Sequence, residues 1–225
     1  MFRTIIFDFD MTLVDSSYAI QDTMNRLAVL RGLPQVTREQ VMTVIGLPIR
    51  ESWVKVWGSF EEEWLTDFRA FFLADEFAGI HPFPGTVPLL DELRLRGIAL
   101  GVASNRQQPV HPLKATGLEK YFSAVVGMGD VPLGKPAPDM IVKCMADLGC
   151  DSSSTLYVGD TLDDIRAARD AGVHSLGLTT GNALRHDLFA EGAWRVIDSL
   201  EEFLPLLDDG QKEPLLPGEK APAVK

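Results

Sequence analysis

Cysteine is scarce in this chain. Its 225 residues include two cysteines, Cys144 and Cys150, which lie six positions apart. Two cysteines are too few for the disulfide framework of a small secreted protein, and this pair falls on a predicted helix and just past its end. We therefore expect both thiols to be reduced, which fits a cytoplasmic protein.

The chain also lacks an excess of basic residues and any long apolar run. Its formal net charge is −11 at pH 7, whereas nucleic acids and anionic membranes are bound by basic surfaces. No apolar run approaches the length needed to span a membrane. The N-terminus lacks a basic region followed by an apolar one, which is the pattern of a secretion signal. We expect a cytoplasmic protein with neither nucleic acid nor membrane as a partner.

Short hydrophobic runs, in contrast, are plentiful. With 46% hydrophobic and 24% charged residues, the chain can bury a full core. From residue 86 onward the patterns of helix and strand alternate, which predicts an α/β fold with a doubly wound parallel sheet. The predicted helices span 86–96, about 109–117, 138–148, 162–171 and 198–207, and the predicted strands span 98–103, 123–127, 155–159 and 173–178.

The segment between the first two predicted strands is mostly helical and too long for one crossover connection. Its predicted helices span 16–32, 38–45, 50–58 and 60–77, and the stiff stretch His81-Pro82-Phe83-Pro84-Gly85 ends it. We therefore expect a core domain at 1–15 and 81–207 with an inserted α-helical domain at 16–80. Residues 208–225 are rich in proline and charged residues, which predicts a disordered tail.

Asp8 and Asp10 are the most informative residues of the chain. They follow a β-branched and aromatic run at 4–7 that predicts a buried strand, and their spacing of two places both carboxylates on one side. Buried carboxylates repel one another and are costly to desolvate. The pair therefore suits a nucleophile beside a proton-transferring group, with a hard metal ion to spread the charge. For the pair alone, an acidic turn that caps the strand is an equal alternative.

Three further polar patches lie at or near predicted strand ends. Ser104 and Asn105 end one apolar run, Gly134-Lys135-Pro136 places a cation in a stiff loop, and the stretch 159–164 brings Asp160 and Asp164 to the start of a helix. Parallel strands end at one edge of their sheet, where open α/β folds bind ligands. We therefore expect these groups to converge there.

Together the four patches resemble the motifs of the haloacid dehalogenase (HAD) superfamily, whose members are mostly phosphatases. The resemblance rests on Asp8-x-Asp10-x-Thr12, Ser104, Lys135 and Gly159-Asp160-x-x-x-Asp164, and it covers about residues 1–205. It implies a Rossmann-like core with the inserted segment 16–80 as a helical cap. Within this superfamily the chain most resembles the phosphoglycolate phosphatase-like members with a small helical cap, because it contains Asp15-Ser16 and Gly46-Leu47-Pro48.

The resemblance implies a covalent mechanism. Asp8 would attack phosphorus and form an aspartyl phosphate. Asp10 would protonate the leaving oxygen and then deprotonate the attacking water. Ser104 would hold a phosphoryl oxygen, and Lys135 would neutralise the phosphoryl group and Asp8. As structural alternatives, Ser104 caps a strand end and Lys135 is an ordinary solvated loop lysine.

The resemblance also implies a metal site and contacts with the substrate. Mg²⁺ would be held by Asp8, by the backbone carbonyl of Asp10 and by Asp160 and Asp164, which lie on one side of their helix. The candidate substrate-binding residues are Thr12, Asn105 and Arg50. Thr12 is equally consistent with a turn role. Arg50 would grip a distal anionic group and is equally consistent with a solvated helix arginine.

Met11 departs from the family pattern, because glycine most often stands at this position. Glycine leaves the backbone free near the phosphate, whereas methionine does not easily reach positive φ. We expect a modest effect on the loop. The departure argues against transferring the substrate of any one subfamily to this chain.

The sequence therefore predicts a magnesium-dependent phosphatase that acts on a small phosphorylated metabolite, either phosphoglycolate-like or a sugar phosphate, as a monomer or homodimer. A phosphomutase of the β-phosphoglucomutase type would keep the same core and pass the phosphoryl group to a sugar hydroxyl. A HAD-like binding protein should have lost at least one of Asp8, Asp10, Lys135 and Asp160, and all four are present. A dehalogenase typically lacks the second aspartate, so Asp10 argues against that activity.

Overall fold

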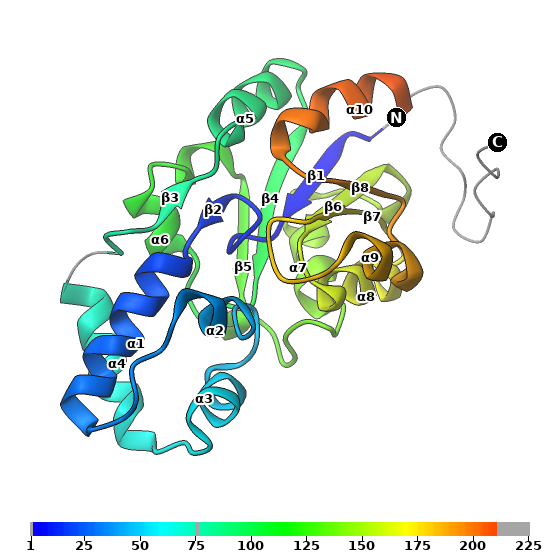
Figure 1. Cartoon of the computed structure of the whole chain (residues 1–225). Helices are drawn as coiled ribbons and strands as arrows, with labels where there is room; N and C mark the ends of the chain where they lie inside the picture. The colour runs from blue at the N-terminus through cyan, green and yellow to red at the C-terminus, as the bar shows by residue number, and fades with distance from the viewer. Residues whose placement is uncertain (1, 75–76, 211–225) are drawn as a thin grey trace.

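A six-stranded parallel sheet lies at the centre of the computed structural model, which describes residues 2–74 and 77–210 (Figure 1). The strand order is β5-β4-β1-β6-β7-β8. This order confirms the predicted doubly wound α/β fold, because the chain runs outward from β1 in both directions. The strands are β1 (Thr4–Phe7), β4 (Ala99–Ser104), β5 (Ala124–Gly127), β6 (Thr155–Gly159), β7 (His174–Leu178) and β8 (Arg195–Ile197).

Strand β1 lies between β4 and β6, and its residues are buried on both faces of the sheet. Ile5 pairs with Leu100 on one side and with Leu156 on the other. Alternate residues point to opposite faces, so Ile5 and Phe7 join one hydrophobic core and Ile6 joins another. The register therefore brings the carboxyl ends of β1, β4 and β6 to one edge of the sheet.

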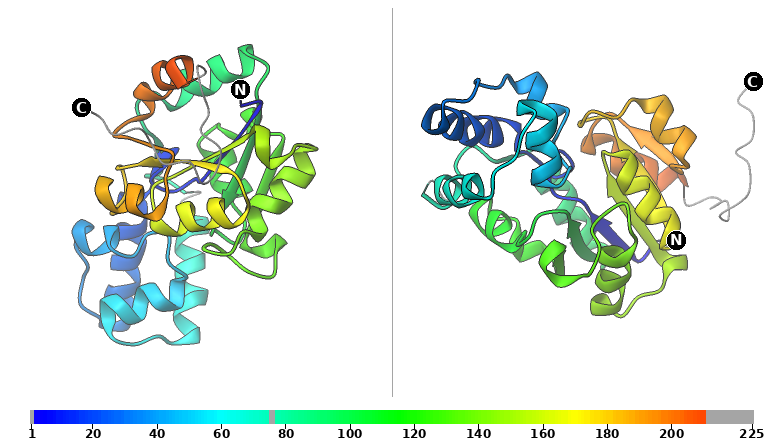
Figure 2. Two further views of the ribbon diagram at one scale, coloured as in Figure 1. Left: turned by 90° about the vertical axis from the view of Figure 1, so that its right-hand side faces the viewer. Right: turned by 90° about the horizontal axis from the view of Figure 1, so that it is seen from below.

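Helices cover both faces of the sheet (Figure 2). The core that contains Phe7 is closed by α5 (Thr86–Leu95), α6 (Val110–Ala115) and α10 (Phe203–Gly210). The core that contains Ile6 is closed by α7 (Asp139–Leu148) and α8 (Leu162–Asp170). Cys144 is buried in this second core, and neither Cys144 nor Cys150 forms a disulfide.

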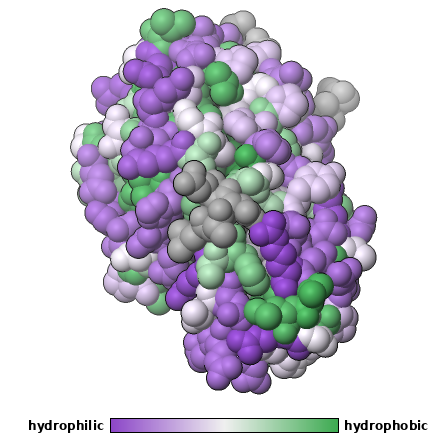
Figure 3. All heavy atoms as spheres, turned by 90° about the vertical axis from the view of Figure 1, so that its left-hand side faces the viewer, coloured by the Kyte–Doolittle hydropathy of each residue, from purple (hydrophilic) through white to green (hydrophobic). Residues whose placement is uncertain are grey.

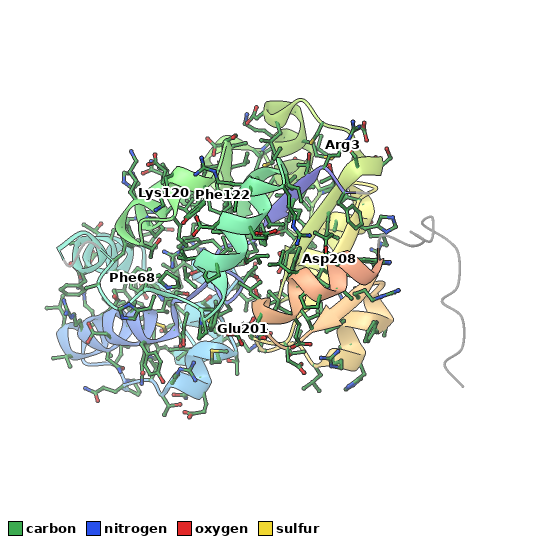
Figure 4. The ribbon with its side chains drawn as sticks, turned by 90° about the horizontal axis from the view of Figure 1, so that it is seen from above. Arg3, Phe68, Lys120, Phe122, Glu201 and Asp208 are labelled. Atoms are coloured by element: carbon green, nitrogen blue, oxygen red, sulfur yellow. The ribbon has the colours of Figure 1, made fainter. Side chains whose placement is uncertain are left out.

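The C-terminal part of the fold differs from the sequence prediction. Helix α9 (Arg185–Glu191) and the edge strand β8 were not predicted, since each is too short to show a clear periodicity. Helix α10 continues to Gly210, three residues into the predicted disordered tail. Its Asp208, labelled in Figure 4, pairs at 2.5 Å with Arg96, the residue that follows α5. Residues 211–225 lie outside the described residues.

Four helices form a separate group beyond the carboxyl edge of the sheet (Figure 1). They are α1 (Ser17–Arg31), α2 (Arg38–Met42), α3 (Ile49–Trp57) and α4 (Glu62–Ala74). Trp53, Trp64 and Phe68 pack in the core of this group, and Figure 4 marks the position of Phe68. We refer to residues 16–80 as the cap, and its exact boundaries stay a prediction.

Two short strands connect the cap with the sheet domain. Strands β2 (Val14–Asp15) and β3 (His81–Pro82) pair antiparallel, with Val14 opposite Pro82. The outgoing and returning chains therefore run side by side, which fixes where the cap is attached.

The face of the molecule in Figure 3 is largely hydrophilic, with small hydrophobic patches that are separate from one another. Among the described residues, no helix is both long and apolar enough to cross a membrane.

Candidate active site

Lys135 lies at the centre of the residues that converge at the carboxyl edge of the sheet. Its Nζ donates to Oδ1 of Asp8 at 2.7 Å, to Oδ1 of Asp164 at 2.7 Å and to the hydroxyl of Tyr157 at 3.0 Å. Its side chain is only 4% exposed. A buried ammonium needs such partners, because an unpaired buried charge is very costly. Lys135 is therefore part of the site and not a solvated loop lysine.

The start of α8 shows why the acidic motif after β6 folds as it does. The backbone N–H of Asp164 donates to Oγ1 of Thr161 at 3.2 Å, and Oδ2 of Asp164 accepts from the backbone N–H of Thr161 at 3.0 Å. This reciprocal pair is a capping box. It leaves the other carboxylate oxygen of Asp164 for Lys135 and for the Tyr157 hydroxyl at 2.9 Å. Asp164 thus caps the start of the helix and also binds Lys135.

Asp160 completes a buried group of three carboxylates. Oxygen atoms of Asp8, Asp160 and Asp164 all lie within 4.8 Å of one another. Oγ1 of Thr12 donates to Oδ1 of Asp160 at 2.9 Å. Three buried carboxylates around one lysine leave negative charge unbalanced, and oxygen donors suit a hard divalent cation. The cluster therefore fits a metal ion of that kind.

Burial and charge shift the pKa values of these carboxylates in different directions. Burial raises the pKa of Asp8 to about 7, although Lys135 opposes the shift. Burial also raises the pKa of Asp160 well above its ordinary value, with Asp164 and Asp8 adding to the effect. Asp164 is buried as well, but the contacts with Lys135 outweigh that burial and lower its pKa. The negative charge that Lys135 does not balance therefore lies mainly on Asp8 and Asp160.

Asp10 is held by Arg106, a residue that the sequence analysis did not select. Nε of Arg106 donates to Oδ2 of Asp10 and Nη2 donates to Oδ1, both at 2.7 Å. Burial raises the pKa of Asp10, but Arg106 more than compensates, so that pKa is lowered. Arg106 follows Ser104-Asn105 directly, and this position next to a motif was the feature of the sequence that could have identified it as a site residue.

Asn105 connects the site with the cap. Its Oδ1 accepts from the backbone N–H of Lys135 at 2.9 Å, and its Nδ2 donates to the carbonyl of Gly46 in the cap at 3.1 Å. On the other side of the site, Nδ2 of Asn182 donates to the cap carbonyl of Met42 at 3.0 Å. The cap is therefore seated on the sheet domain.

The remaining sequence-predicted residues are placed as follows. Ser104 is buried at the end of β4 and lines the pocket, and its Oγ accepts from the backbone N–H of Arg106 at 3.3 Å. Thr12 is fully buried against Asp160, which gives it an anchoring role. Arg50 also lines the pocket, but its side chain is 62% exposed and donates to Glu62 at 2.8 Å.

Met11 adopts the positive φ that the sequence analysis regarded as difficult for methionine. Its φ is 57°, and its side chain is buried in the cap core. The backbone N–H of Met11 donates to the carbonyl of Val14 at 2.8 Å, and the Thr180 hydroxyl donates to the carbonyl of Met11. A left-handed conformation costs a non-glycine residue roughly 1–2 kcal/mol, and these contacts offset that cost.

A pocket of about 750 Å³ lies between the cap and the carboxyl edge of the sheet. The sheet domain supplies most of its polar wall, and the cap supplies most of its apolar wall. The polar wall includes Asp8, Asp10, Ser104, Asn105, Arg106 and Lys135, and the apolar wall includes Ile20, Met24, Val44, Ile45, Trp53, Leu65 and Phe68. A volume of this size holds a small molecule.

The family described as haloacid dehalogenase-like hydrolases matches residues 5–178 of this chain. The chain belongs to that family. Its four motifs converge as the HAD resemblance implies, and the chain is an enzyme, a hydrolase of the HAD phosphatase type.

Curated relatives and solved structures agree with this assignment. A phosphoglycolate phosphatase of Photorhabdus laumondii is 32% identical over 80% of this chain and 81% of its own length. A pyrophosphatase of Oceanobacillus iheyensis is 30% identical over 77% of this chain and 81% of its own. A structure described as a predicted phosphoglycolate phosphatase from Haemophilus somnus is 26% identical, with a TM-score of 0.82 over 92% of this chain and 98% of its own.

Proposed function

We propose that this HAD hydrolase is a Mg²⁺-dependent phosphatase that hydrolyses a small phosphate monoester through an aspartyl phosphate on Asp8. The observation that carries the proposal is the buried arrangement of Asp8, Asp160 and Asp164 around Lys135, open to a pocket that the cap covers. The names of the phosphatase and pyrophosphatase relatives support a phosphorylated substrate.

The proposed reaction has two steps at one phosphorus atom. A carboxylate oxygen of Asp8 attacks phosphorus, and the bond between phosphorus and the leaving oxygen breaks with its electron pair on that oxygen, which takes a proton from Asp10. Water then attacks the phosphorus of the aspartyl phosphate. Asp10 accepts the proton of that water, and phosphate and free Asp8 are released.

Lys135 fixes the orientation of the nucleophile. It holds Oδ1 of Asp8 at 2.7 Å and is itself held by Asp164 and Tyr157. An ammonium fixed in a dry site stabilises the negative charge on the phosphoryl oxygens more than it would in water. In this proposal Ser104, at the end of β4, donates to one of those oxygens.

The carboxylates of Asp8, Asp160 and Asp164, with the backbone carbonyl of Asp10, would hold the Mg²⁺ ion. When bound, this ion would neutralise negative charge on Asp8 and on the phosphoryl group. The all-oxygen donor set suits Mg²⁺. Thr12 keeps Asp160 in place through its hydrogen bond.

The first test uses Asp8→Asn, which keeps the shape of the side chain and removes the nucleophilic carboxylate. We expect phosphate release from a panel of small phosphoesters to be abolished, while circular dichroism stays unchanged. Substantial activity in this variant would exclude the covalent mechanism. Removing divalent cations with EDTA should stop the wild-type reaction, and added Mg²⁺ should restore it.

A second measurement separates the phosphatase from a phosphomutase. Both would form the aspartyl phosphate, but a mutase would return the phosphoryl group to another hydroxyl of a sugar phosphate. ³¹P NMR of a reaction with hexose 1-phosphate distinguishes inorganic phosphate from hexose 6-phosphate. Formation of the 6-phosphate without free phosphate would replace the proposed hydrolysis with transfer.

A further inference from the structure

Apolar side chains from different helices of the cap border the pocket. Ile20 of α1, Ile49 of α3 and Leu65 of α4 are partly buried against the cap core, and all three line the pocket. Covering such side chains with a ligand is favourable in proportion to the apolar area that is removed from water. The cap therefore presents an apolar surface to the molecule that the pocket binds.

The cap core lies directly behind this surface. Core residues also line the pocket, each no more than 9% exposed, among them Met24, Ile45, Trp53 and Phe68. The ring centroids of Trp53 and Phe68 lie 5.3 Å apart. A closely packed core resists changes of shape, so the apolar wall is a built part of the cap and not a set of flexible surface side chains.

The polar residues of the cap do not interrupt this apolar wall. The Ser52 hydroxyl donates to the carbonyl of Val44 at 3.2 Å, so it is directed into the cap. Arg50 is 62% exposed and pairs with Glu62 at 2.8 Å, and Arg69 is exposed as well. Charges that water reaches contribute little to binding. The cap thus offers the interior of the pocket hydrocarbon and not charge.

The opposite wall of the pocket has the polarity that a phosphoryl group requires. Asp8 and Lys135 lie there, 2.7 Å apart, and Nε2 of His111 lies 2.9 Å from Oε1 of Gln108. In phosphoryl transfer the leaving oxygen lies roughly in line with the attacking oxygen, on the far side of phosphorus. Because the cap stands beyond the carboxyl edge of the sheet (Figure 1), the leaving portion extends from Asp8 toward the apolar wall.

The size of the pocket indicates a leaving portion with many atoms. Its volume of about 750 Å³ is in the upper part of the range of about 300–1,000 Å³ for small-molecule sites. A leaving portion of two carbon atoms would leave most of this space to water, which would then stay in contact with the apolar wall. A longer hydrocarbon displaces that water and covers the wall, which is the more favourable arrangement.

We propose that the cap selects phosphate monoesters whose leaving portion is an extended apolar group, such as an alkyl chain. This inference rests on the proposed phosphatase function and names its substrate class. The phosphoryl group lies at Asp8 and Lys135, and the hydrocarbon covers Ile20, Ile49 and Leu65. Hydrolysis then releases inorganic phosphate and an apolar alcohol.

The experiment measures phosphate release from n-alkyl phosphates, from ethyl to octyl. Their leaving oxygens have nearly the same basicity, so differences in kcat/KM report contacts of the chain with the pocket. In wild type, kcat/KM should rise about threefold for each added methylene until the pocket is filled. Hexyl phosphate should also exceed its analogues that end in a hydroxyl or a carboxylate by about tenfold, because the apolar wall offers these groups no partner.

Variants of two leucines assign the effect to the apolar wall. Leu65→Asn nearly keeps the size of the side chain and should lower the ratio of octyl to ethyl kcat/KM by about tenfold, whereas Leu65→Met should keep most of the ratio. Leu33→Asn is the matched control, since Leu33 is partly buried against the same cap core but is not among the residues that line the pocket. It should lower the melting temperature and leave the ratio unchanged.

Three results would overturn the inference: equal kcat/KM along the alkyl series in wild type, a preference of wild type for the chain that ends in a carboxylate, or an equal fall of the ratio in Leu65→Asn and Leu33→Asn. The first two need no variant, so they decide the question even where a variant does not fold. Failure of the proposed function is recognised separately, because wild type would then release no phosphate from any alkyl phosphate or from p-nitrophenyl phosphate.

Discussion

Gly181, in the loop after β7, lies directly against the carboxylate of Asp160. A β-carbon built on Gly181 would stand 1.9 Å from Oδ2 of Asp160 and 2.8 Å from its Cγ. No side chain fits there without moving the carboxylate. Its neighbours Thr180 and Asn182 donate to the carbonyls of Met11 and of the cap residue Met42. This loop therefore contacts a proposed metal ligand, the loop after β1 and the cap at once.

Gly181→Ala should displace Asp160 and weaken Mg²⁺ activation. We expect the Mg²⁺ concentration for half-maximal phosphate release to rise by about tenfold or more, as when groups that orient a metal ligand are lost. Gly97→Ala is the matched control. Gly97 has φ +72° with open space around its β-carbon position, so its variant should lose stability through backbone strain and keep the Mg²⁺ response. An unchanged response in Gly181→Ala would remove Asp160 from the metal site.

The pH dependence of stability should reveal the unbalanced carboxylates. Burial raises the pKa of Asp8 in the folded protein to about 7 from 3.8, and that of Asp160 is raised as well. A carboxyl group whose pKa is higher in the folded than in the unfolded protein stabilises the folded state at low pH. This stabilisation is complete below the unfolded-state pKa and is lost as pH rises through the folded-state pKa. The metal-free protein should therefore melt at progressively lower temperature between pH 5 and pH 8, about the window of these shifts.

Mg²⁺ should reverse this loss, because it binds the deprotonated carboxylates. The difference in melting temperature between samples with Mg²⁺ and with EDTA should grow from pH 5 to pH 8, about the same window. Asp160→Asn should reduce that growth, since one carboxylate no longer titrates. A Mg²⁺ effect of equal size at every pH would show that the ion binds elsewhere.

Lys135→Ala should remove the cation that balances Asp8 and Asp164. We expect kcat/KM for phosphate release to fall by well over about tenfold, or roughly 1.4 kcal/mol in transition-state stabilisation. Lys143→Ala is the control, because Lys143 forms a surface pair with Asp147 four residues on. A loss smaller than tenfold would assign the charge balance to another group, and the first candidate would be Arg106.

The motif residues were predictable because each belongs to a short pattern at the end of a strand. Asp8 and Asp10 follow one buried apolar run, and Asp160 and Asp164 follow another. Such patterns indicate the carboxyl edge of a sheet even when the pairing of the strands is not known. The strand order and the register come from contacts far apart in the sequence, so they were not predicted. The length of the helical segment between the first two strands predicted the inserted cap, but not the depth or the apolar wall of its pocket.

Arg106 and Tyr157 were missed for different physical reasons. Arg106 follows Ser104-Asn105 directly, but its contact with Asp10, 96 residues away in the sequence, exists only in the folded chain. Tyr157 occupies an apolar position of the buried strand β6, where its ring packs in the core and only its hydroxyl reaches the site. Arg50 stood out by its position after Gly46-Leu47-Pro48, yet its pairing with Glu62 depends on α4, which the pattern around it does not show.

Tyr157 should support catalysis through its hydroxyl alone. That hydroxyl accepts from Nζ of Lys135 at 3.0 Å and lies 2.9 Å from Oδ1 of Asp164 and 3.1 Å from the carbonyl of Ala103. Burial raises its pKa well above the ordinary value, with Asp164 and Asp8 adding to the shift. The hydroxyl is therefore neutral at physiological pH and acts by orienting Lys135 and Asp164.

Tyr157→Phe should lower kcat by about three- to tenfold with little change in KM, because Lys135 keeps both carboxylates but loses its third partner. The free energy of unfolding should fall by about 1–2 kcal/mol, since buried polar groups lose a partner. Tyr121→Phe removes an equivalent hydroxyl from Asp91, so it should cost stability without affecting kcat. Equal kcat in both variants would mean that the Tyr157 hydroxyl serves only the stability of the sheet domain, and that the two carboxylates suffice to hold Lys135 in place.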